Sequence, residues 1–259
     1  MATPEIHPTA IVENGAELAD DVVIGPLAYV GPLVRIGAGT RLHHHATVEG
    51  NTSLGAGNEV FPYALVGGRT QDKKWAGDEA PVVIGDNNIF REHMTVHTAT
   101  FDAGETRIGS GNLFCAYSHI GHESHVGDDC VFSNNATLGG HCVIGDRVVI
   151  GGLSAVHQFV HVGTMSMIAG MARVVQDVMP GMIVEGTPAT HRTFNKVGLQ
   201  RAGYTEEDLI IAKRLYKHFF RSKLNRGQAE EVLRAGELGE HPLYTLVLSF
   251  LDSSTRGLA

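Results

Sequence analysis

The chain has 259 residues, of which 43% are hydrophobic and 19% charged, so it can form a large packed domain and is not intrinsically disordered. Its net charge of −8 argues against a nucleic-acid surface, and no apolar run approaches the length of a transmembrane helix. The N-terminal run MATPEIHPTAIVENG lacks the basic and apolar regions of a signal peptide, and the three cysteines show no CxxC spacing. We therefore expect a cytoplasmic protein without disulfides or a transmembrane segment.

One position in every six carries an aliphatic residue or Phe, from Ile6 to Val174. Of the 29 multiples of six in this range, 26 keep the pattern, and many are followed by Gly, which we expect to supply the positive φ of a sharp corner. A period of six predicts turns of 18 residues, each with three short parallel strands and the repeated side chains pointing inward. The predicted fold class is an all-β parallel β-helix. Hexapeptide proteins of this kind wind left-handed, although the period alone does not give the hand.

The repeat fails at Asp72, Asp78 and Asp102, and it returns in phase after each of them. We therefore expect loops that leave and rejoin the coil at about 67–81 and 97–107. The first loop carries the only tryptophan, Trp75, together with Asp72 and Lys74. Loops on a rigid scaffold often carry function, and a tolerated surface insertion is the alternative.

Beyond Val174 the repeat ends, and prolines and glycines between 180 and 188 indicate a linker. From Thr205 the pattern becomes helical, with a capping box in which Asp208 takes the N3 place. We divide the chain into a β-helix domain, 1–190, and a small α-helical C-terminal domain, 191–259.

Basic residues are concentrated in one segment of the chain. Between 192 and 226 there are nine Lys or Arg and three acidic residues, which gives this segment a charge of +6 and the rest of the chain a charge of −14. This asymmetry indicates an anionic partner at the helical end, and a solvated helix face is the alternative.

Histidines cluster at His119, His122 and His125. The 18-residue turn places Gly140 one turn beyond His122, and Gln158 one turn further on. We expect His122 to act as a general base, the Gly140 N–H to bind an oxyanion, and Glu123 or another carboxylate to orient the base. This combination suits acyl transfer to a hydroxyl. Neither a GxSxG motif nor a P-loop is present.

A metal site is the competing interpretation of these histidines. The run His122-Glu-Ser-His125 lacks HExxH spacing, and His119 and His125 fall on successive sides of the triangle, so that their side chains diverge. The sequence thus predicts no metal, and ligands from two subunits remain the one route to a zinc site, as in carbonic anhydrases of the hexapeptide fold. We expect structural or solvated roles for a further six histidines: His7, His43, His44, His45, His93 and His161.

Several runs match one family end to end: HPTAIVENGA, TQDKKWAG, SHIGHESHVG, NNATLGGH, GGLSAVHQF, VVQDVMPG, NKVGLQRAGYT and SSTRGL. With them the chain resembles the UDP-N-acetylglucosamine O-acyltransferases that begin lipid A synthesis in Gram-negative bacteria. The resemblance implies a homotrimer of left-handed β-helices with active sites between subunits. It also implies transfer of a 3-hydroxyacyl chain from acyl carrier protein to the 3-hydroxyl of UDP-N-acetylglucosamine, without a cofactor.

The resemblance implies particular site residues as well. The catalytic base falls on His122 and the oxyanion donor on the N–H of Gly140. Substrate contacts and supporting site residues fall on the following positions: Asp72, Lys74, His119, His141, His157, Gln158, Asn195 and Arg201. The basic segment would receive the acidic carrier protein and its phosphopantetheine phosphate.

The chain departs from the family pattern at three places. Glu123 stands where Asp is common beside the base, and Val197 stands where some members carry a Glu near the nucleotide. Gly170 occupies the position of the acyl-chain ruler, where a small residue predicts a long groove.

Three alternatives to this assignment stay open. One is an acceptor with a 3-amino group in place of the hydroxyl, a second is a zinc lyase, and a third is a purely structural β-helix. The related N-acyltransferase of lipid A synthesis usually carries an N-terminal uridine-binding domain, for which a repeat beginning at Ile6 leaves no room.

Overall fold

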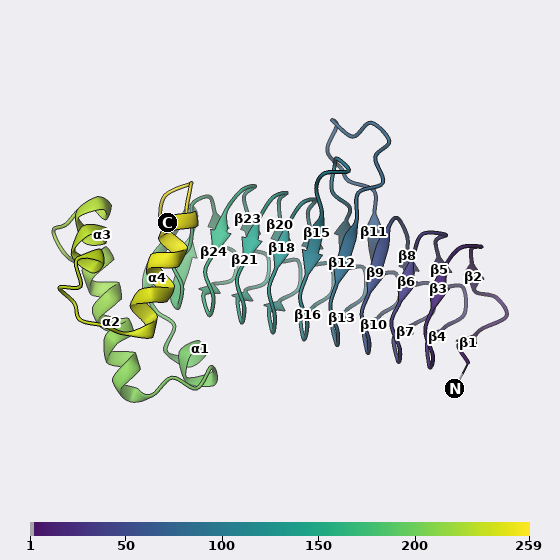
Figure 1. Cartoon of the computed structure of the whole chain (residues 1–259), viewed down its shortest axis with the longest axis horizontal. Coiled ribbons are helices and arrows are strands. Elements are labelled where there is room, and N and C mark those ends of the chain that lie inside the picture. Colours follow the sequence, from purple (N-terminus) through teal and green to yellow (C-terminus); the bar gives the residue numbers. More distant parts are fainter. Residues whose placement is uncertain (1–2) are drawn as a thin grey trace.

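The computed structural model describes residues 3–259. It forms a long prism of stacked turns with a group of helices at the C-terminal end (Figure 1). Three sheets, here named A, B and C, form the sides of the prism, and strands of neighbouring turns pair in parallel. The 18-residue register of the regular turns is observed directly, because Val23 pairs with Arg41 and Val131 with Val149.

The strands of each sheet follow one another along the prism. Sheet A contains β1 (Glu5–Ile6), β4 (Val23–Ile24), β7 (Arg41–Leu42), β10 (Glu59–Val60), β13 (Ile89–Phe90), β16 (Leu113–Phe114), β19 (Val131–Phe132), β22 (Val149–Ile150), β25 (Met167–Ile168), β27 (Met182–Gly186) and β28 (Ala189–Phe194). Sheet B contains β2 (Ile11–Val12), β5 (Tyr29–Val30), β8 (Thr47–Val48), β11 (Leu65–Gly68), β14 (Thr95–His97), β17 (His119–Ile120), β20 (Thr137–Leu138), β23 (Ala155–Val156) and β26 (Arg173–Val174). Sheet C contains β3 (Glu17–Leu18), β6 (Arg35–Ile36), β9 (Thr52–Leu54), β12 (Val82–Ile84), β15 (Thr106–Ile108), β18 (His125–Val126), β21 (Val143–Ile144) and β24 (His161–Val162).

The repeated apolar side chains fill the prism. Ile24, Phe114 and Ile150 are fully buried, and the rings of Phe90, Phe114 and Phe132 follow one another at centroid distances of 5.3 and 5.0 Å. The first turn is the exception: Ile6 is 45% exposed, and Val12 and Leu18 are only partly buried, because no further turn covers them. Burial of a continuous apolar column is what stabilises a stack of short strands that could not persist alone.

The prediction that the repeated glycines supply the positive φ of the corners is wrong at most positions. Of those that follow a repeated apolar residue, Gly67 has a positive φ, whereas Gly127 and Gly145 do not. The positive φ falls on non-glycine corner residues instead, such as Tyr117 (φ 62°). The glycines are needed for space: a Cβ on Gly145 would lie 2.6 Å from the backbone nitrogen of Thr164 in the next turn.

Two excursions leave the coil at the corner between sheets B and C. One connects β11 to β12 and the other connects β14 to β15, and they protrude from the prism together (Figure 1). Their contact is direct, since the N–H of Thr98 donates to the carbonyl of Gly68 at 2.8 Å and the N–H of Glu79 donates to the Asp102 carboxylate at 2.9 Å.

The expected linker between 180 and 188 is instead ordered structure. β27 pairs in parallel with β25 and then turns back to pair antiparallel with β28. Gly186 and Pro188 lie at the turn of a hairpin that closes the last turn of the coil, and Pro180 and Gly181 form the turn that precedes it. β28 crosses residue 190, and the domain boundary placed there remains a prediction.

Four helices follow: α1 (Lys196–Arg201), α2 (Glu206–Phe220), α3 (Arg226–Arg234) and α4 (Pro242–Ser253). The predicted capping box at α2 is confirmed, because the Thr205 and Asp208 side chains each bond the other residue's backbone N–H. Buried side chains of α2 and α4 pack on Met165, Met179 and Met182 at the end of the coil. No helix within residues 3–259 is long and apolar enough to cross a membrane.

Candidate active site

A polar cleft of about 480 Å³ lies beside the corner between sheets B and C. The first excursion forms one wall, and three successive turns of the corner form the other. Its lining residues are Gln71, Asp72, Lys73, Lys74, His97, His119, Gly121, His122, Gly139, Gly140 and Gln158. Six of the residues assigned from the sequence therefore line one cleft: His122, Gly140, Asp72, Lys74, Gln158 and His119.

His122 and Glu123 form a close pair at the centre of this corner. The imidazole Nδ1 of His122 contacts Glu123 Oε2 within hydrogen-bond range, and each side chain is only 10% exposed. The other carboxylate oxygen, Oε1, accepts the backbone N–H of Thr100 at 2.7 Å. Of the two tautomers of a neutral imidazole, a carboxylate at Nδ1 favours the one with its proton on Nδ1. Nε2 is then an acceptor that can take a proton.

Gly140 stacks directly over His122, as the 18-residue turn predicts. The N–H of His141 donates to the His122 carbonyl at 2.8 Å, so the two corners are in register. A Cβ built on Gly140 would lie 2.5 Å from His122 Nε2. Within the described residues 3–259 the Gly140 N–H has no hydrogen-bond acceptor, so a donor is available beside Nε2.

Further histidines surround the pair. His119 Nδ1 lies 2.8 Å from Thr95 Oγ1, and burial lowers the pKa of His119. Burial also lowers the pKa of His141, whose ring meets that of His122 edge to face at 5.2 Å and stacks on Phe159 at 4.5 Å. These rings are therefore neutral at pH 7 and contribute apolar walls and hydrogen-bonding nitrogens.

Sequence reasoning missed His97. It lies on the cleft wall at the end of β14, its ring meets that of His119 edge to face at 4.9 Å, and burial lowers its pKa to about 4. The 18-residue ruler does not connect His97 to His119, because the second excursion intervenes. In the structure β14 pairs with β17 so that Thr95 aligns with His119, and the length of the second excursion, which sets this register, could not be read from the repeat alone.

The first excursion presents its polar side chains to the cleft. Asp72 Oδ1 accepts the backbone N–H of Lys74 at 3.0 Å, which holds the carboxylate within the loop. The ring N–H of Trp75 donates to the Asp78 carbonyl at 2.9 Å, and the guanidinium of Arg69 lies 4.8 Å from the centre of the Trp75 ring. The loop therefore holds a defined conformation beside the cleft, and its role in substrate binding remains a prediction.

Six assigned residues do not line the cleft. Glu123 and His141 nevertheless contact His122, and the other four lie further away. His157 is exposed, with Nδ1 3.1 Å from the Gln158 carbonyl oxygen, and Gly170 is exposed at the corner between sheets A and B. Asn195 is buried as the N-cap of α1, and its side chain donates to the Met165 carbonyl at 2.8 Å. Arg201 is exposed at the end of α1. Met165 belongs to the corner between sheets C and A, so α1 sits across sheet C from His122 in the same chain.

The predicted divergence of His119 and His125 is observed, since His119 lies on β17 of sheet B and the exposed His125 on β18 of sheet C. A different group has metal-ligand spacing within residues 3–259: atoms of His122, Glu123 and His141 lie within 4.8 Å of one another. This set reuses the base and its carboxylate. A cation there would compete with the hydrogen bond between Nδ1 and Oε2.

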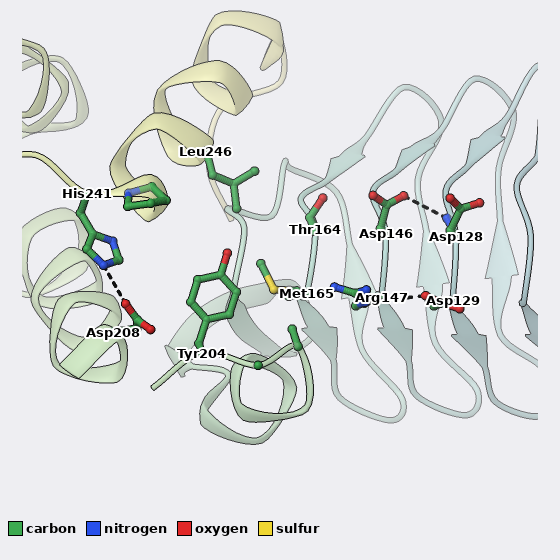
Figure 2. Close-up of a pocket in the computed structure, with 13 residues that line it drawn as sticks. Asp128, Asp129, Asp146, Arg147, Thr164, Met165, Tyr204, Asp208, His241 and Leu246 are labelled. Atoms are coloured by element: carbon green, nitrogen blue, oxygen red, sulfur yellow. Dashed lines mark hydrogen bonds and ion pairs between the residues drawn. The ribbon is translucent and has the colours of Figure 1, made fainter. Parts of the chain in front are cut away.

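A second cavity, of about 540 Å³, separates the helices from the coil. Figure 2 shows His241 directed at Asp208 and Arg147 at Asp129, and these pairs lie 2.8 and 3.7 Å apart. Asp146 accepts the backbone N–H of Asp128 at 2.9 Å. Its acidic side chains are thus engaged with partners in the same chain, and none of the residues assigned from the sequence lines it.

A parallel β-helix built from six-residue repeats is the fold of the bacterial hexapeptide transferases. The family model for bacterial transferase hexapeptides (six repeats) matches residues 105–140, and that for UDP-N-acetylglucosamine O-acyltransferase, domain 2, matches residues 177–259. The chain belongs to the UDP-N-acetylglucosamine O-acyltransferase family, as its relatives establish.

Curated relatives match over almost the whole chain. An acyl-(acyl-carrier-protein)–UDP-N-acetylglucosamine O-acyltransferase from Akkermansia muciniphila is 45% identical, and one from Saccharophagus degradans is 42% identical; each match covers 98% of both chains. The LpxA structure from Acinetobacter baumannii superposes with a TM-score of 0.94 at 40% identity, covering 98% of this chain and 99% of that one. The predicted left-handed β-helix with a helical C-terminal domain is thereby confirmed.

Proposed function

We propose that the protein transfers a 3-hydroxyacyl chain from acyl carrier protein to the glucosamine 3-hydroxyl of UDP-N-acetylglucosamine, the first step of lipid A biosynthesis. The names of the full-length relatives support the substrates. The observation that carries the chemistry is the position of the free Gly140 N–H beside Nε2 of His122, because this places an oxyanion donor next to a base.

In this proposal His122 Nε2 removes the proton of the sugar hydroxyl as its oxygen attacks the thioester carbonyl. The carbonyl oxygen becomes an oxyanion and accepts the Gly140 N–H. Collapse of the tetrahedral intermediate breaks the carbon–sulfur bond, and the imidazolium returns its proton to the leaving thiolate. Glu123 stabilises the imidazolium through Nδ1. No covalent enzyme intermediate and no cofactor are required.

The proposed active enzyme is a homotrimer. Asn195 and Arg201, assigned to the nucleotide, lie on a different edge of the prism from His122, so a complete site requires a neighbouring chain. The corner between sheets A and B carries exposed apolar residues in register, including Leu27, Tyr117 and Met171. Exposed apolar side chains along one edge, although His93 and Asn135 interrupt them, support association with other copies of the chain.

The proposed carrier protein binds at the helices. Lys213, Lys217 and Arg221 recur at four-residue spacing on α2 and its C-cap, all are exposed, and none forms a salt bridge within residues 3–259. Their unpaired charge would attract an acidic protein and a phosphate. Both proposed substrates are intracellular, and we therefore place the enzyme in the cytoplasm.

The cluster of His122, Glu123 and His141 favours one alternative, a zinc-dependent lyase. Metal analysis of the purified protein separates the two functions. Stoichiometric zinc, with activity lost to a chelator, would support the lyase, whereas metal-free protein that transfers acyl chains would exclude it.

The test of the proposed function is a transfer assay with 3-hydroxyacyl carrier protein and UDP-N-acetylglucosamine, run in parallel with the 3-amino sugar nucleotide. We expect His122→Ala to lower kcat by about 10²- to 10⁴-fold, the usual contribution of a general base. His125→Ala is the matched control, because His125 is exposed on the next strand and outside the cleft. Equal rates for the two variants would refute the base assignment.

A further inference from the structure

Three threonines join the two excursions next to the cleft. The N–H of Thr70 donates to Thr98 Oγ1 at 3.2 Å, and the hydroxyls of Thr70 and Thr100 lie 3.2 Å apart. All three residues are buried although they lie in loops. Buried hydroxyl groups in contact with each other hold a specific arrangement of the two loops, because separating them would leave each without a partner.

One end of this contact reaches the base. The Thr100 N–H donates to Glu123 Oε1 at 2.7 Å, and the Thr100 hydroxyl lies 3.4 Å from both Glu123 Oε2 and His122 Nδ1. At 3.4 Å the hydroxyl contacts are long, so the backbone bond fixes the carboxylate and the hydroxyl adds to its polar surroundings. Thr100 thus touches the pair without entering the cleft.

The other end reaches the substrate loop. Thr70 Oγ1 accepts the N–H of Asp72 at 3.1 Å, and Asp72 Oδ1 accepts the N–H of Lys74 at 3.0 Å. Because Thr70 Oγ1 accepts the N–H of Asp72, the Thr70 hydroxyl can donate its own proton to Thr100 Oγ1. The Thr100 hydroxyl can then donate its proton to Glu123. One run of hydrogen bonds in a single direction therefore extends from the loop to the carboxylate beside the base.

We propose that Thr70 and Thr100 are positioning residues whose hydroxyl pair sets the place of the Asp72 loop relative to the His122–Glu123 pair. The inference rests on the proposed function, in which the loop holds the acceptor sugar and His122 takes its proton. Transfer then depends on the distance from the sugar hydroxyl to Nε2. A displacement of about 1 Å in such a geometry can cost about a hundredfold in rate.

The test replaces each hydroxyl by a methyl group of the same shape, in Thr70→Val, Thr100→Val and the double variant. We expect each single variant to lower kcat/KM for the acceptor about tenfold, as for the loss of one buried hydrogen-bonding pair. The double variant should lose less than the sum of the two single losses, because both substitutions remove the contact between Thr70 and Thr100. Each removes further contacts of its own only with Asp72 or with the His122–Glu123 pair. Thr70→Ser and Thr100→Ser keep the hydroxyl group, and these variants should retain most of the kcat/KM of the parent protein.

Thr40→Val is the matched control. Thr40 is also buried, donates to the Gly55 carbonyl at 3.0 Å and accepts the N–H of Asn58 at 3.1 Å, but it lies at another corner, away from the cleft. We expect it to lower thermal stability and to leave kcat and KM unchanged. Additive losses in the double valine variant, or equal kinetic losses in Thr40→Val, would overturn the proposal.

A readout without activity separates this inference from the proposed function. The ¹⁵N shifts of the His122 ring report its tautomer, and we expect them to change in Thr70→Val and Thr100→Val but not in Thr40→Val. Unchanged shifts in the first two variants would refute the positioning role, whatever the outcome for His122→Ala. Full activity of His122→Ala would instead refute the base assignment. The ¹⁵N shifts of the His122 ring in the threonine variants would still report whether the threonines position that ring.

Discussion

Gly140 and His122 lie so close that no side chain fits between them: a Cβ on Gly140 would stand 2.5 Å from Nε2 and 2.8 Å from Nδ1 of the imidazole. The φ of Gly140 is not in the left-handed region, so alanine suits its backbone, and the methyl group would collide with the ring alone. The absence of a side chain at Gly140 thus leaves room for the His122 ring, which is the base in the proposed function.

The first prediction follows from this contact. We expect Gly140→Ala to displace the His122 ring and to lower kcat at least about a hundredfold, comparable to the loss of a base or an oxyanion donor. Thermal unfolding should stay close to that of the parent protein. The comparison is Gly152→Ala, whose Cβ would meet the Asn134 carbonyl oxygen at 3.2 Å and touch none of the side chains assigned to the site. A fully active Gly140→Ala enzyme would show that Nε2 is not the reacting atom.

The second prediction concerns a ladder of buried asparagines within the coil. Asn88 Nδ2 donates to Asn58 Oδ1 at 3.0 Å, and Asn112 Nδ2 donates to Asn88 Oδ1 at 2.8 Å. Asn88→Ala leaves the N–H of Asn112 and the Gly109 carbonyl without their side-chain partner. We expect a loss of about 3 kcal/mol in chemical denaturation, since each buried unsatisfied group costs about 1–3 kcal/mol. Asn134→Ala, at an exposed corner position, should change stability by less than about 0.5 kcal/mol.

The third prediction is acid sensitivity where the helices meet the coil. Burial lowers the pKa of His191 from 6.5 to about 4, its Nε2 accepts the N–H of Met179 at 3.0 Å, and its ring stacks on Phe220 at 4.1 Å. The unfolded chain binds this proton below about pH 6.5 and the folded chain only below about pH 4, so stability falls as the pH drops through this window. The loss reaches about 3 kcal/mol for a shift of this size.

Thermal unfolding followed between pH 7 and pH 4 measures this effect. Burial gives His97 a pKa of about 4 as well, and that histidine adds a loss of the same sign. His191→Gln should be less stable than the parent at pH 7 and should lose less on acidification, because it no longer titrates. An identical pH slope in the parent and the variant would show that His191 is already charged in the folded protein.

The fourth prediction concerns acyl-chain length. Gly170 is exposed beside Met171, at the corner that we propose to face a neighbouring chain. A Cβ there meets the Gly152 carbonyl oxygen at 3.3 Å, which a small shift can relieve. Gly170→Met should therefore fold normally and shift the preference toward shorter acyl chains, measured with a series of acyl carrier proteins. An unchanged preference would place the end of the groove elsewhere.

Much of the scaffold could be predicted from one regularity. A side chain that recurs every six residues can be buried only if the backbone turns through three equal sides, and 18-residue turns then align His122 with Gly140 and Gln158. The capping box of α2 is equally local, because its bonds join residues three apart. In both cases the determining interactions lie within a short stretch or repeat at a fixed spacing.

What only the tertiary structure decided lies where that spacing is interrupted. The two excursions change the number of residues between aligned positions, so the 18-residue spacing did not predict the contact of His97 with His119. It also did not predict the contact between Thr70 and Thr100, which are 30 positions apart with hydroxyls 3.2 Å from each other. The repeat also could not show that its glycines provide room for the next turn, or that α1 lies across sheet C from the base. A loop conformation and the docking of helices depend on contacts distant in sequence, and no local pattern encodes them.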